Sequence, residues 1–274
     1  MWICTPPHAL EPQYPGAVEQ PLSLCECWDA EALYRQREEI TTLCGEIGSL
    51  HRQAMRYLGG AAGILREVRT LAEAHTDLRK IIRYAHSIAE RELPDLKKTG
   101  TEQKRLLSAI TNQGAMLFSE TLETLTPHLY CIEDPYGAAA GHLIEALRVE
   151  AIRRGYDIIT CPCGLTPQTK NDHLLIPALG LGFVTSNRFH PVTSAGRAIH
   201  AQRFTDSVAM KSCKMRVRFL QKTADMLLRQ AACTMAAAKS RHDDLEKIYR
   251  SAMDFEKVNA VGDGFLQRFS RMLH

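Results

Sequence analysis

A short segment in the middle of the chain joins a predicted strand to a predicted helix, and it restricts the fold more than any other feature. Residues 129–141 read L-Y-C-I-E-D-P-Y-G-A-A-A-G: an apolar run stops at a turn, and apolar side chains then recur at helical spacing over residues 143–152. This is the setting of a Walker A phosphate loop, G-x-x-x-x-G-K-[ST], whose backbone amides and lysine hold nucleotide phosphates. Here Ala140 stands at the lysine position, Gly141 at the Ser/Thr position and Asp134 at the first glycine. The segment therefore predicts the shape of a phosphate loop without its usual chemical groups.

Length and composition are those of an ordinary globular protein. A chain of 274 residues can bury a substantial core and hold one or two domains. The net charge of +3 is too small to indicate nucleic-acid binding, and no apolar run approaches the roughly 20 residues that cross a bilayer. The N-terminus lacks the basic and long apolar regions of a secretory signal. The nine cysteines follow no disulfide framework, which predicts a reducing, cytoplasmic location.

The chain divides into four regions of different character. Residues 1–28 are rich in proline and predict an extended segment. Residues 29–93 predict a helical arm that Asp29 caps at its start, and residues 206–274 predict a second, C-terminal helical arm. Between the two arms, residues 94–205 predict a domain of strands and helices. Long helical hairpins are therefore expected to flank this domain.

The central domain contains several short apolar runs bounded by turn residues. Strands are predicted at residues 115–118, 129–132, 156–161, 173–177 and 181–185. Apolar strands that alternate with helices indicate crossover connections. The predicted fold class is therefore α/β, with a parallel, P-loop NTPase-like sheet and flanking helices. In the first arm, the pair Gly59-Gly60 predicts a break or kink.

The two helical regions share an internal repeat. Residues 54–80 align without gaps on residues 231–257, so that residue n matches residue n + 177. Leu58 matches Met235 and Ala61 matches Ala238. Chance agreement between two amphipathic helices is the alternative explanation. If the repeat is a duplication, the phosphate loop of the first copy would precede Met1, and residues 1–28 would be the remnant of that copy's P-loop domain.

Several segments together resemble a poorly characterised bacterial family of duplicated P-loop ATPases. They are residues 15–18, 27–29, 57–58, 106–114, 154–157, 175–180 and 252–257. Members of this family have two P-loop domains in tandem, each followed by a helical arm, and the resemblance covers nearly the whole chain. It implies binding of ATP and Mg²⁺. It also implies a partner, either the missing upstream P-loop domain or a second copy that pairs through the helical arms.

The resemblance and the loop together give one candidate cofactor site. Its residues are Asp134, Pro135, Tyr136, Gly137, Ala138, Ala139, Ala140, Gly141 and His142. Only Gly137 matches a glycine of the family's loop, so the lysine and Ser/Thr roles do not transfer. What remains is a helix start with free amides, a weak anion site, next to the negative charges of Glu133 and Asp134. No catalytic residue and no metal ligand is predicted.

Substitute cations for the missing lysine are Lys170, Arg188 and His142. Lys170 and His142 also fit ordinary surface roles. A Walker B strand would end in a carboxylate, but the strand over residues 181–185 is followed by Ser186 and Asn187. ATP hydrolysis is therefore expected to be weak or absent, and whether the chain is an ATPase stays open.

Three functions are consistent with the sequence. The first is an ATP-binding or other nucleotide-binding P-loop protein with impaired hydrolysis. The alternative is a non-catalytic structural or interaction module that pairs through its helical arms. The third is a thiol or zinc protein that uses two Cys-x-Cys pairs, Cys25/Cys27 and Cys161/Cys163, whose thiols would share a face if each pair lay on a strand.

Overall fold

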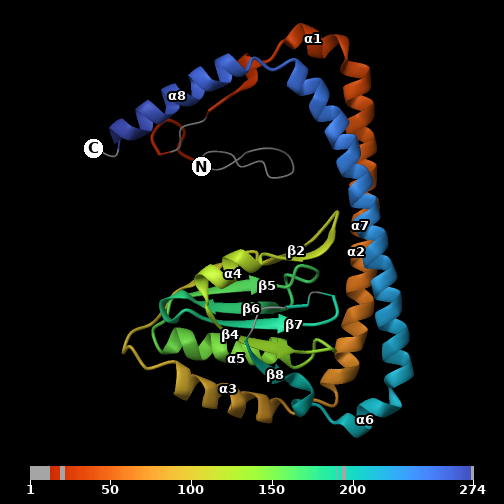
Figure 1. Cartoon of the computed structure of the whole chain (residues 1–274), viewed down its shortest axis with the longest axis vertical. Coiled ribbons are helices and arrows are strands. Elements are labelled where there is room, and N and C mark those ends of the chain that lie inside the picture. The colour runs from red at the N-terminus through yellow and green to blue at the C-terminus, as the bar shows by residue number, and fades with distance from the viewer. Residues whose placement is uncertain (1–12, 19–21, 190, 193–195, 273–274) are drawn as a thin grey trace. The chain divides into compact units, whose positions relative to one another are not determined.

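The computed structural model of the chain describes residues 13–18, 22–189, 191–192 and 196–272 (Figure 1). The chain forms two compact units. The larger unit is Gly48–Lys239, and the smaller unit combines Met1–Ile47 with Ser240–His274. Two long helices, α2 (Arg37–Glu73) and α7 (Lys214–Ser251), contribute residues to both units. No helix in the described residues is both long enough and apolar enough to span a membrane.

A mixed six-stranded sheet forms the centre of the larger unit. Its strands lie in the order β1-β5-β6-β7-β4-β8. Their bounds are β1 (Glu102–Lys104), β4 (His128–Glu133), β5 (Ile158–Pro162), β6 (Asn171–Ile176), β7 (Leu181–Ser186) and β8 (Arg197–His200). The predicted strands at 129–132, 156–161, 173–177 and 181–185 are confirmed as β4, β5, β6 and β7. The fold class is therefore α/β.

The prediction of a purely parallel sheet is wrong at one strand. β6 pairs antiparallel with both of its neighbours, β5 and β7, whereas all other pairs in the sheet are parallel. The connections explain the difference. Only residues 163–170 link β5 to β6, and β6 reaches β7 through the short η2 (Pro177–Leu179). A parallel return needs a crossover of a dozen or more residues, so these short links allow only an antiparallel partner.

Helices cover both faces of the sheet (Figure 1). On one face, α5 (Ala140–Arg153) packs on the strands, and α3 (Leu78–Glu92) packs against α5 in the main core. The other face carries α4 (Ser119–Leu125) and a separate antiparallel hairpin, β2 (Ser108–Thr111) with β3 (Gly114–Leu117). The predicted strand at 115–118 therefore lies in this hairpin and not in the main sheet. Although α3 falls in the range 29–93 that the sequence assigns to an arm, it belongs to the core of the α/β domain.

Local signals set the ends of α5. The helix follows Gly137, whose φ is +72°, and it ends before Gly155, whose φ is +93°. Glycine adopts these left-handed angles without the cost that a β-carbon imposes. The helix therefore ends at Arg153, two residues before this left-handed glycine.

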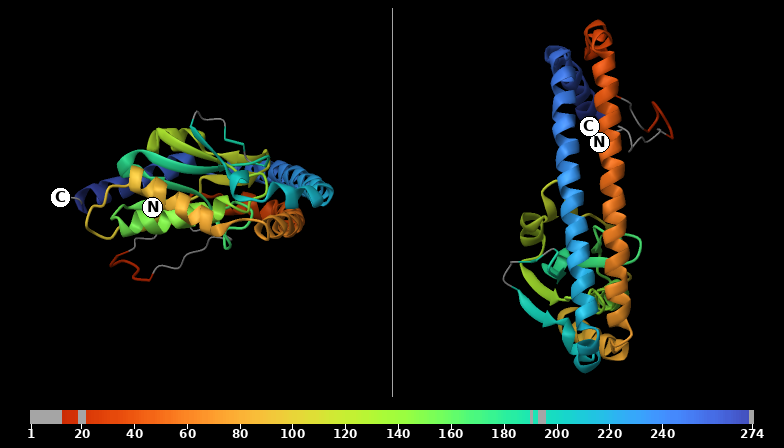
Figure 2. Two further views of the ribbon diagram at one scale, coloured as in Figure 1. Left: turned by 90° about the horizontal axis from the view of Figure 1, so that it is seen from below. Right: turned by 90° about the vertical axis from the view of Figure 1, so that its right-hand side faces the viewer.

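The predicted break at Gly59-Gly60 is wrong, because α2 continues through both residues. Within the larger unit, α2 and α7 run side by side (Figure 2). A β-carbon at Gly60 would stand 3.3 Å from Leu227 Cδ1 on α7. The neighbouring Ala61 and the α7 residue Ala238 are both fully buried. Small residues here allow two helices to approach closely, and this packing outweighs the weak helix propensity of glycine.

The smaller unit is built around the far ends of the same two helices. It contains η1 (Cys25–Cys27), α1 (Ala30–Arg35), the start of α2, the end of α7, and α8 (Phe255–Met272). Asp29 caps α1, as predicted, by accepting from the amides of Glu31 and Ala32. Residues 25–27 form a turn of 3-10 helix and not the predicted extended segment. Much of the remaining range 1–28 lies outside the described residues.

Elements of the two units match at the offset of 177 residues, well beyond the 54–80 range of the sequence alignment. The starts of α6 (Ser207–Ser212) and α7 lie 177 positions after those of α1 and α2, and η3 (Ala201–Phe204) overlaps the position that matches η1. Asp206 caps α6 through the amides of Val208 and Ala209, as Asp29 caps α1. Both repeats therefore begin with the same capped short helix.

Backbone hydrogen bonds repeat at the same offset. In the smaller unit, the Asp29 amide donates to Ala252 O and the Asp254 amide donates to Cys27 O, each at 2.8 Å. In the larger unit, the Asp206 amide donates to His75 O and the Asp77 amide donates to Phe204 O, again at 2.8 Å. Isolated bridges join Trp28 to Met253 and Thr205 to Thr76. Every residue in the first set has its mate 177 positions away in the second, so the two units contain the same hydrogen-bonded frame.

Candidate functional site

Asp134 fills the loop between β4 and α5 with its own side chain. Its Oδ1 accepts from the backbone amides of Tyr136 (3.1 Å) and Gly137 (2.9 Å). Its Oδ2 accepts from those of Ala139 (2.9 Å) and Ala140 (2.8 Å). The residue is only 2% exposed. Amides that converge in a loop before a helix form an anion site. In this chain the bound anion is a carboxylate of the loop itself.

The expectation of free amides at the start of α5 is therefore wrong for Ala139 and Ala140. The sequence did contain a signal for this arrangement. Asp side chains commonly accept from amides two or three residues ahead in tight turns. Comparison with the Walker A pattern instead presented Asp134 as a repulsive charge beside an empty phosphate position. The left-handed Gly137 curls the loop so that amides up to six residues ahead reach the same carboxylate.

Lys170 lies over this loop. A β-carbon at Gly137 would stand 3.9 Å from Lys170 Nζ, and one at Gly141 would stand 3.7 Å from its Cβ. Nζ pairs with Asp172 Oδ1 at 2.6 Å, and the two side chains are 16% and 2% exposed. Burial by itself lowers the pKa of this ammonium, but the Asp172 carboxylate outweighs it, so the pKa of Lys170 is raised. Lys170 therefore keeps its charge, and Asp172 neutralises it.

Cys163 borders the same cluster. Burial raises the pKa of its thiol, and the Asp172 carboxylate raises it further, although Lys170 opposes the shift. Because the thiolate is the reactive form of cysteine, this environment is unsuited to a nucleophile.

A cavity of about 540 Å³ opens beside the loop, at the edge where β4, β5 and β7 end. It lies within the larger unit, between this edge, the β2–β3 hairpin, α2 and α7. Its charged lining consists of Arg66, Arg69, Asp134, Lys170, Asp172, Arg188, Asp225 and Arg229. The charged lining therefore contains five basic and three acidic residues. Small-molecule sites have this size, and in open α/β sheets they occur at this edge.

The remaining predicted site residues have different surroundings. Pro135 and Tyr136 line the cavity, whereas Ala138, Ala139 and Ala140 are buried. His142 Nε2 lies 3.4 Å from Glu73 Oε1 on α2. Gly141 is next to the side chain of Lys170, as described above.

Arg188 and Glu133, which the sequence analysis also considered, each form an ion pair. Arg188 pairs with Asp225 at 3.8 Å, and Glu133 pairs with His200 at 2.6 Å. The end of β7 supplies a backbone group to the loop, since Ser186 O accepts from the Asp134 amide at 3.0 Å. Of the three candidate cations, Lys170 alone lies over the loop.

The Cys-x-Cys pairs do not lie on matching strands. Cys25 and Cys27 are in η1, with Cys25 exposed and Cys27 buried. Cys161 is in β5, where burial raises its pKa to about 12, and Cys163 follows that strand. None of the cysteines in the described ranges joins a cluster of three metal ligands.

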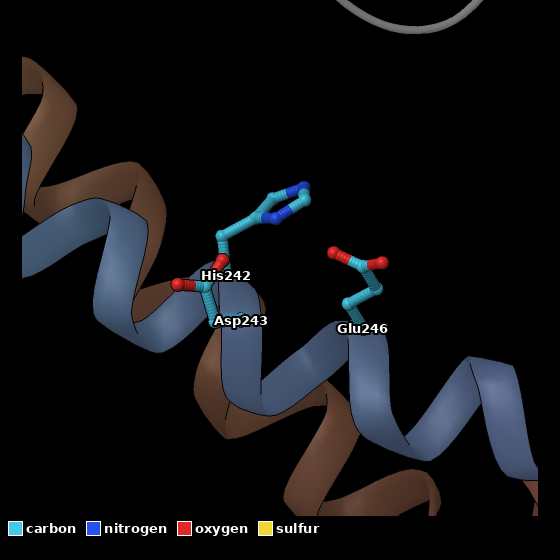
Figure 3. Close-up of side chains that lie close together, drawn as sticks. All are labelled: His242, Asp243 and Glu246. Atoms are coloured by element: carbon cyan, nitrogen blue, oxygen red, sulfur yellow. The ribbon is translucent and has the colours of Figure 1, made fainter.

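One group of metal-ligand residues does occur on the last turns of α7 in the smaller unit. Figure 3 shows His242 and Glu246 extending from the helix near Asp243. Their ligand atoms lie within 4.8 Å of one another, and His242 and Glu246 are exposed. Within the described part of the chain no fourth ligand joins them. All three come from neighbouring turns of one surface helix, which is usual for a solvated polar face.

Comparisons with known proteins found no relative of this chain. No protein-family model matches the chain, and neither the curated proteins nor the solved structures include a match.

Proposed function

We propose that this chain is a P-loop-like α/β protein that does not hydrolyse nucleotide and acts as a non-catalytic interaction module. One observation carries this proposal: the four amides of the loop already bind the Asp134 carboxylate. The loop has the strand–turn–helix form of a phosphate loop. The Asp134 side chain occupies the position between the loop amides where a phosphate would bind.

The residues do not fit ATP with Mg²⁺ in this loop. A phosphate would have to displace a buried carboxylate that accepts four backbone hydrogen bonds, and hydrogen bonds to a charged group are stronger than those between neutral groups. The displaced negative charge would then lie close to the incoming one. Ala140 and Gly141 offer neither the cation nor the hydroxyl that nucleotide and metal require. The ammonium of Lys170, which lies over the loop, is paired with Asp172.

Thermal melting with millimolar Mg-ATP tests the proposal. A ligand at 100 times its Kd stabilises the folded state by about 2.7 kcal/mol, which raises the melting temperature of a chain of this size by several degrees. We expect no shift for the wild type. Asp134→Gly exposes the loop amides, so this variant is expected to gain a shift with inorganic phosphate or ATP. Asp29→Gly removes a capping carboxylate in the other unit and serves as the matched control. A wild-type shift that Asp134→Gly abolishes would contradict the proposal.

Nucleotide binding outside the loop is a second candidate, and the cavity favours it. Its volume of about 540 Å³ and its excess of basic residues suit an organic anion such as a nucleotide. In that case Mg-ATP would raise the wild-type melting temperature, and the double variant Arg69→Gln/Arg188→Gln would lose the shift. Asp134→Gly would leave the shift in place, which separates this candidate from binding in the loop.

A further inference from the structure

Helices α3 and α8 are equivalent elements of the two repeats. Each follows a capping aspartate, Asp77 or Asp254, whose carboxylate accepts from the amide three residues ahead, Lys80 or Lys257. The amides of these two aspartates donate to Phe204 O and Cys27 O, which are also equivalent. The frame that directs α3 away from α2 is therefore the frame that directs α8 away from α7.

The two helices differ in what covers them. In the larger unit, α3 packs against η3 and extensively against α5. In the smaller unit, η1 is the equivalent of η3 and contacts α8, but among the described residues no helix takes the place of α5. Among the described residues of the smaller unit, the equivalent of α3 is therefore present, whereas a sheet and a helix like those that cover α3 are not.

The side chains repeat this contrast. The buried face of α3 contains Ile81, Ala85, Ile88 and Ala89, all at most 1% exposed. Of their mates on α8, Val258, Gly262 and Phe265 are half-buried, and Leu266 is exposed. Leu266 is 60% exposed, and a β-carbon at Gly262 would meet no atom within 4 Å. Phe269, which lies on the same face and stacks on Phe265, is 51% exposed. Contiguous apolar faces of this kind mark interaction sites.

We propose that this face of α8 is the docking surface for an α/β domain of another polypeptide, which covers α8 as α5 and the sheet cover α3. The duplicated frame is the argument for this class of partner, because it holds α8 as it holds a helix already packed on such a domain. The proposal does not depend on whether the loop at Asp134 binds nucleotide.

A second copy of this chain does not suit the surface. Its α/β domain already holds α3 at the equivalent position, with Ile81 and Ile88 at most 1% exposed, and would have to release that helix first. The helix of the partner that contacts α8 is also expected to differ from α5 in the sizes of its contacting side chains. Leu266 is larger than Ala89, and Gly262 is smaller than Ala85, so the partner needs a small residue opposite Leu266 and a larger one opposite Gly262.

Site-specific photo-crosslinking in the source cells tests the partner. A benzophenone amino acid replaces Leu266 or Phe269 on the face, and Gln267, on the opposite side of the helix by its spacing of about 100° per residue, is the matched control. We expect crosslinks from the first two positions and not from Gln267. The crosslinked peptides should belong to a helix that covers the sheet of an α/β domain. The proposal fails if the crosslinks reach only a second copy, only residues 1–24 of the same chain, lipid, or a protein without such a domain, or if none form.

A melting experiment on the purified chain tests the same face independently of any partner. Leu266→Asp is expected to change the melting temperature by no more than about 2 °C, because this side chain is 60% exposed. The matched change Ala89→Asp places an unpaired carboxylate at a fully buried position of α3 and is expected to lower the melting temperature by more than about 10 °C or to prevent folding. Equal losses in the two variants would show that α8 is packed within this chain and would overturn the proposal.

Discussion

The carboxylate of Asp134 and the amide of Gly137 are joined by a hydrogen bond of 2.9 Å, and Gly137 makes this contact with a φ of +72°. The Asp134 side chain thus stabilises the left-handed conformation of Gly137, and that conformation directs the Gly137 amide toward the carboxylate. Three more amides converge on the same carboxylate. The loop is therefore expected to be a rigid, stabilising element of the fold.

Loss of the Asp134 carboxylate should destabilise the chain in proportion to the bonds that are lost. Asp134→Ala removes the acceptor for four amides and is expected to cost about 3–5 kcal/mol. Asp134→Asn keeps one acceptor oxygen and should cost about half as much. Urea unfolding measures both. The control Asp29→Ala removes a helix cap and should cost about 1 kcal/mol. Equal effects of all three changes would contradict the special role of Asp134.

Gly137→Ala should destabilise the chain by about 1–2 kcal/mol, because an L-residue adopts a left-handed conformation at this cost. A β-carbon there would meet only Lys170 Nζ at 3.9 Å, so strain and not crowding causes the loss. Gly137→Asn should be milder, since asparagine tolerates this region better. Equilibrium unfolding compares the two variants, and an Asn variant no more stable than the Ala variant would refute this explanation.

Two adjacent glycines of α2 should respond differently to alanine. Nothing lies within 4 Å of a β-carbon at Gly59, whereas one at Gly60 would be 3.3 Å from Leu227 Cδ1. Gly59→Ala is therefore expected to stabilise by about 0.5–1 kcal/mol through helix propensity. Gly60→Ala should gain less, or lose stability, because the Leu227 side chain of α7 must give way to the added β-carbon. Thermal melting of the pair measures the difference, and an equal gain in both would show that α7 does not constrain Gly60.

Stability should fall as the pH rises above about 9, in part through Cys161. Burial raises the pKa of this thiol from 9.0 to about 12 in the folded chain. Between these values the unfolded chain releases a proton that the folded chain retains, so unfolding becomes easier with rising pH. The contribution is at most about 1.4 kcal/mol per pH unit. Urea midpoints from pH 8 to pH 11 should fall less steeply for Cys161→Ala. Equal slopes for the wild type and Cys161→Ala would contradict this assignment.

The matched caps Asp29 and Asp206 should contribute similarly. Each accepts from the amides two and three residues ahead, and each begins a six-residue helix. Asp29→Ala and Asp206→Ala are each expected to cost about 1 kcal/mol. Hydrogen exchange of the two short helices reports each loss locally, and a large effect at only one of them would indicate that the frames are not energetically equivalent.

Local patterns in the sequence were enough to place much of the secondary structure. Four strands of the sheet and the cap at Asp29 depend on contacts within a few residues, which apolar runs and the position of a capping side chain specify directly. The register of the repeat was also visible, because two helices that bury equivalent faces preserve the same apolar spacing.

Tertiary structure alone decided the features that bear on function. The strand direction of β6 depends on the length of its connections and on which neighbours it reaches. The uninterrupted course of α2 at Gly60 depends on α7, and the burial of α3 depends on α5. Asp134 differs from the pattern-based prediction because a motif compares residue types at fixed positions, whereas the ligand of an amide is whichever acceptor the folded backbone brings within 3 Å. The direction of β6, the course of α2 and the burial of α3 exist only after distant segments have packed. The four hydrogen bonds of Asp134 exist only after the backbone has turned at Gly137, so residue types at motif positions do not by themselves specify them.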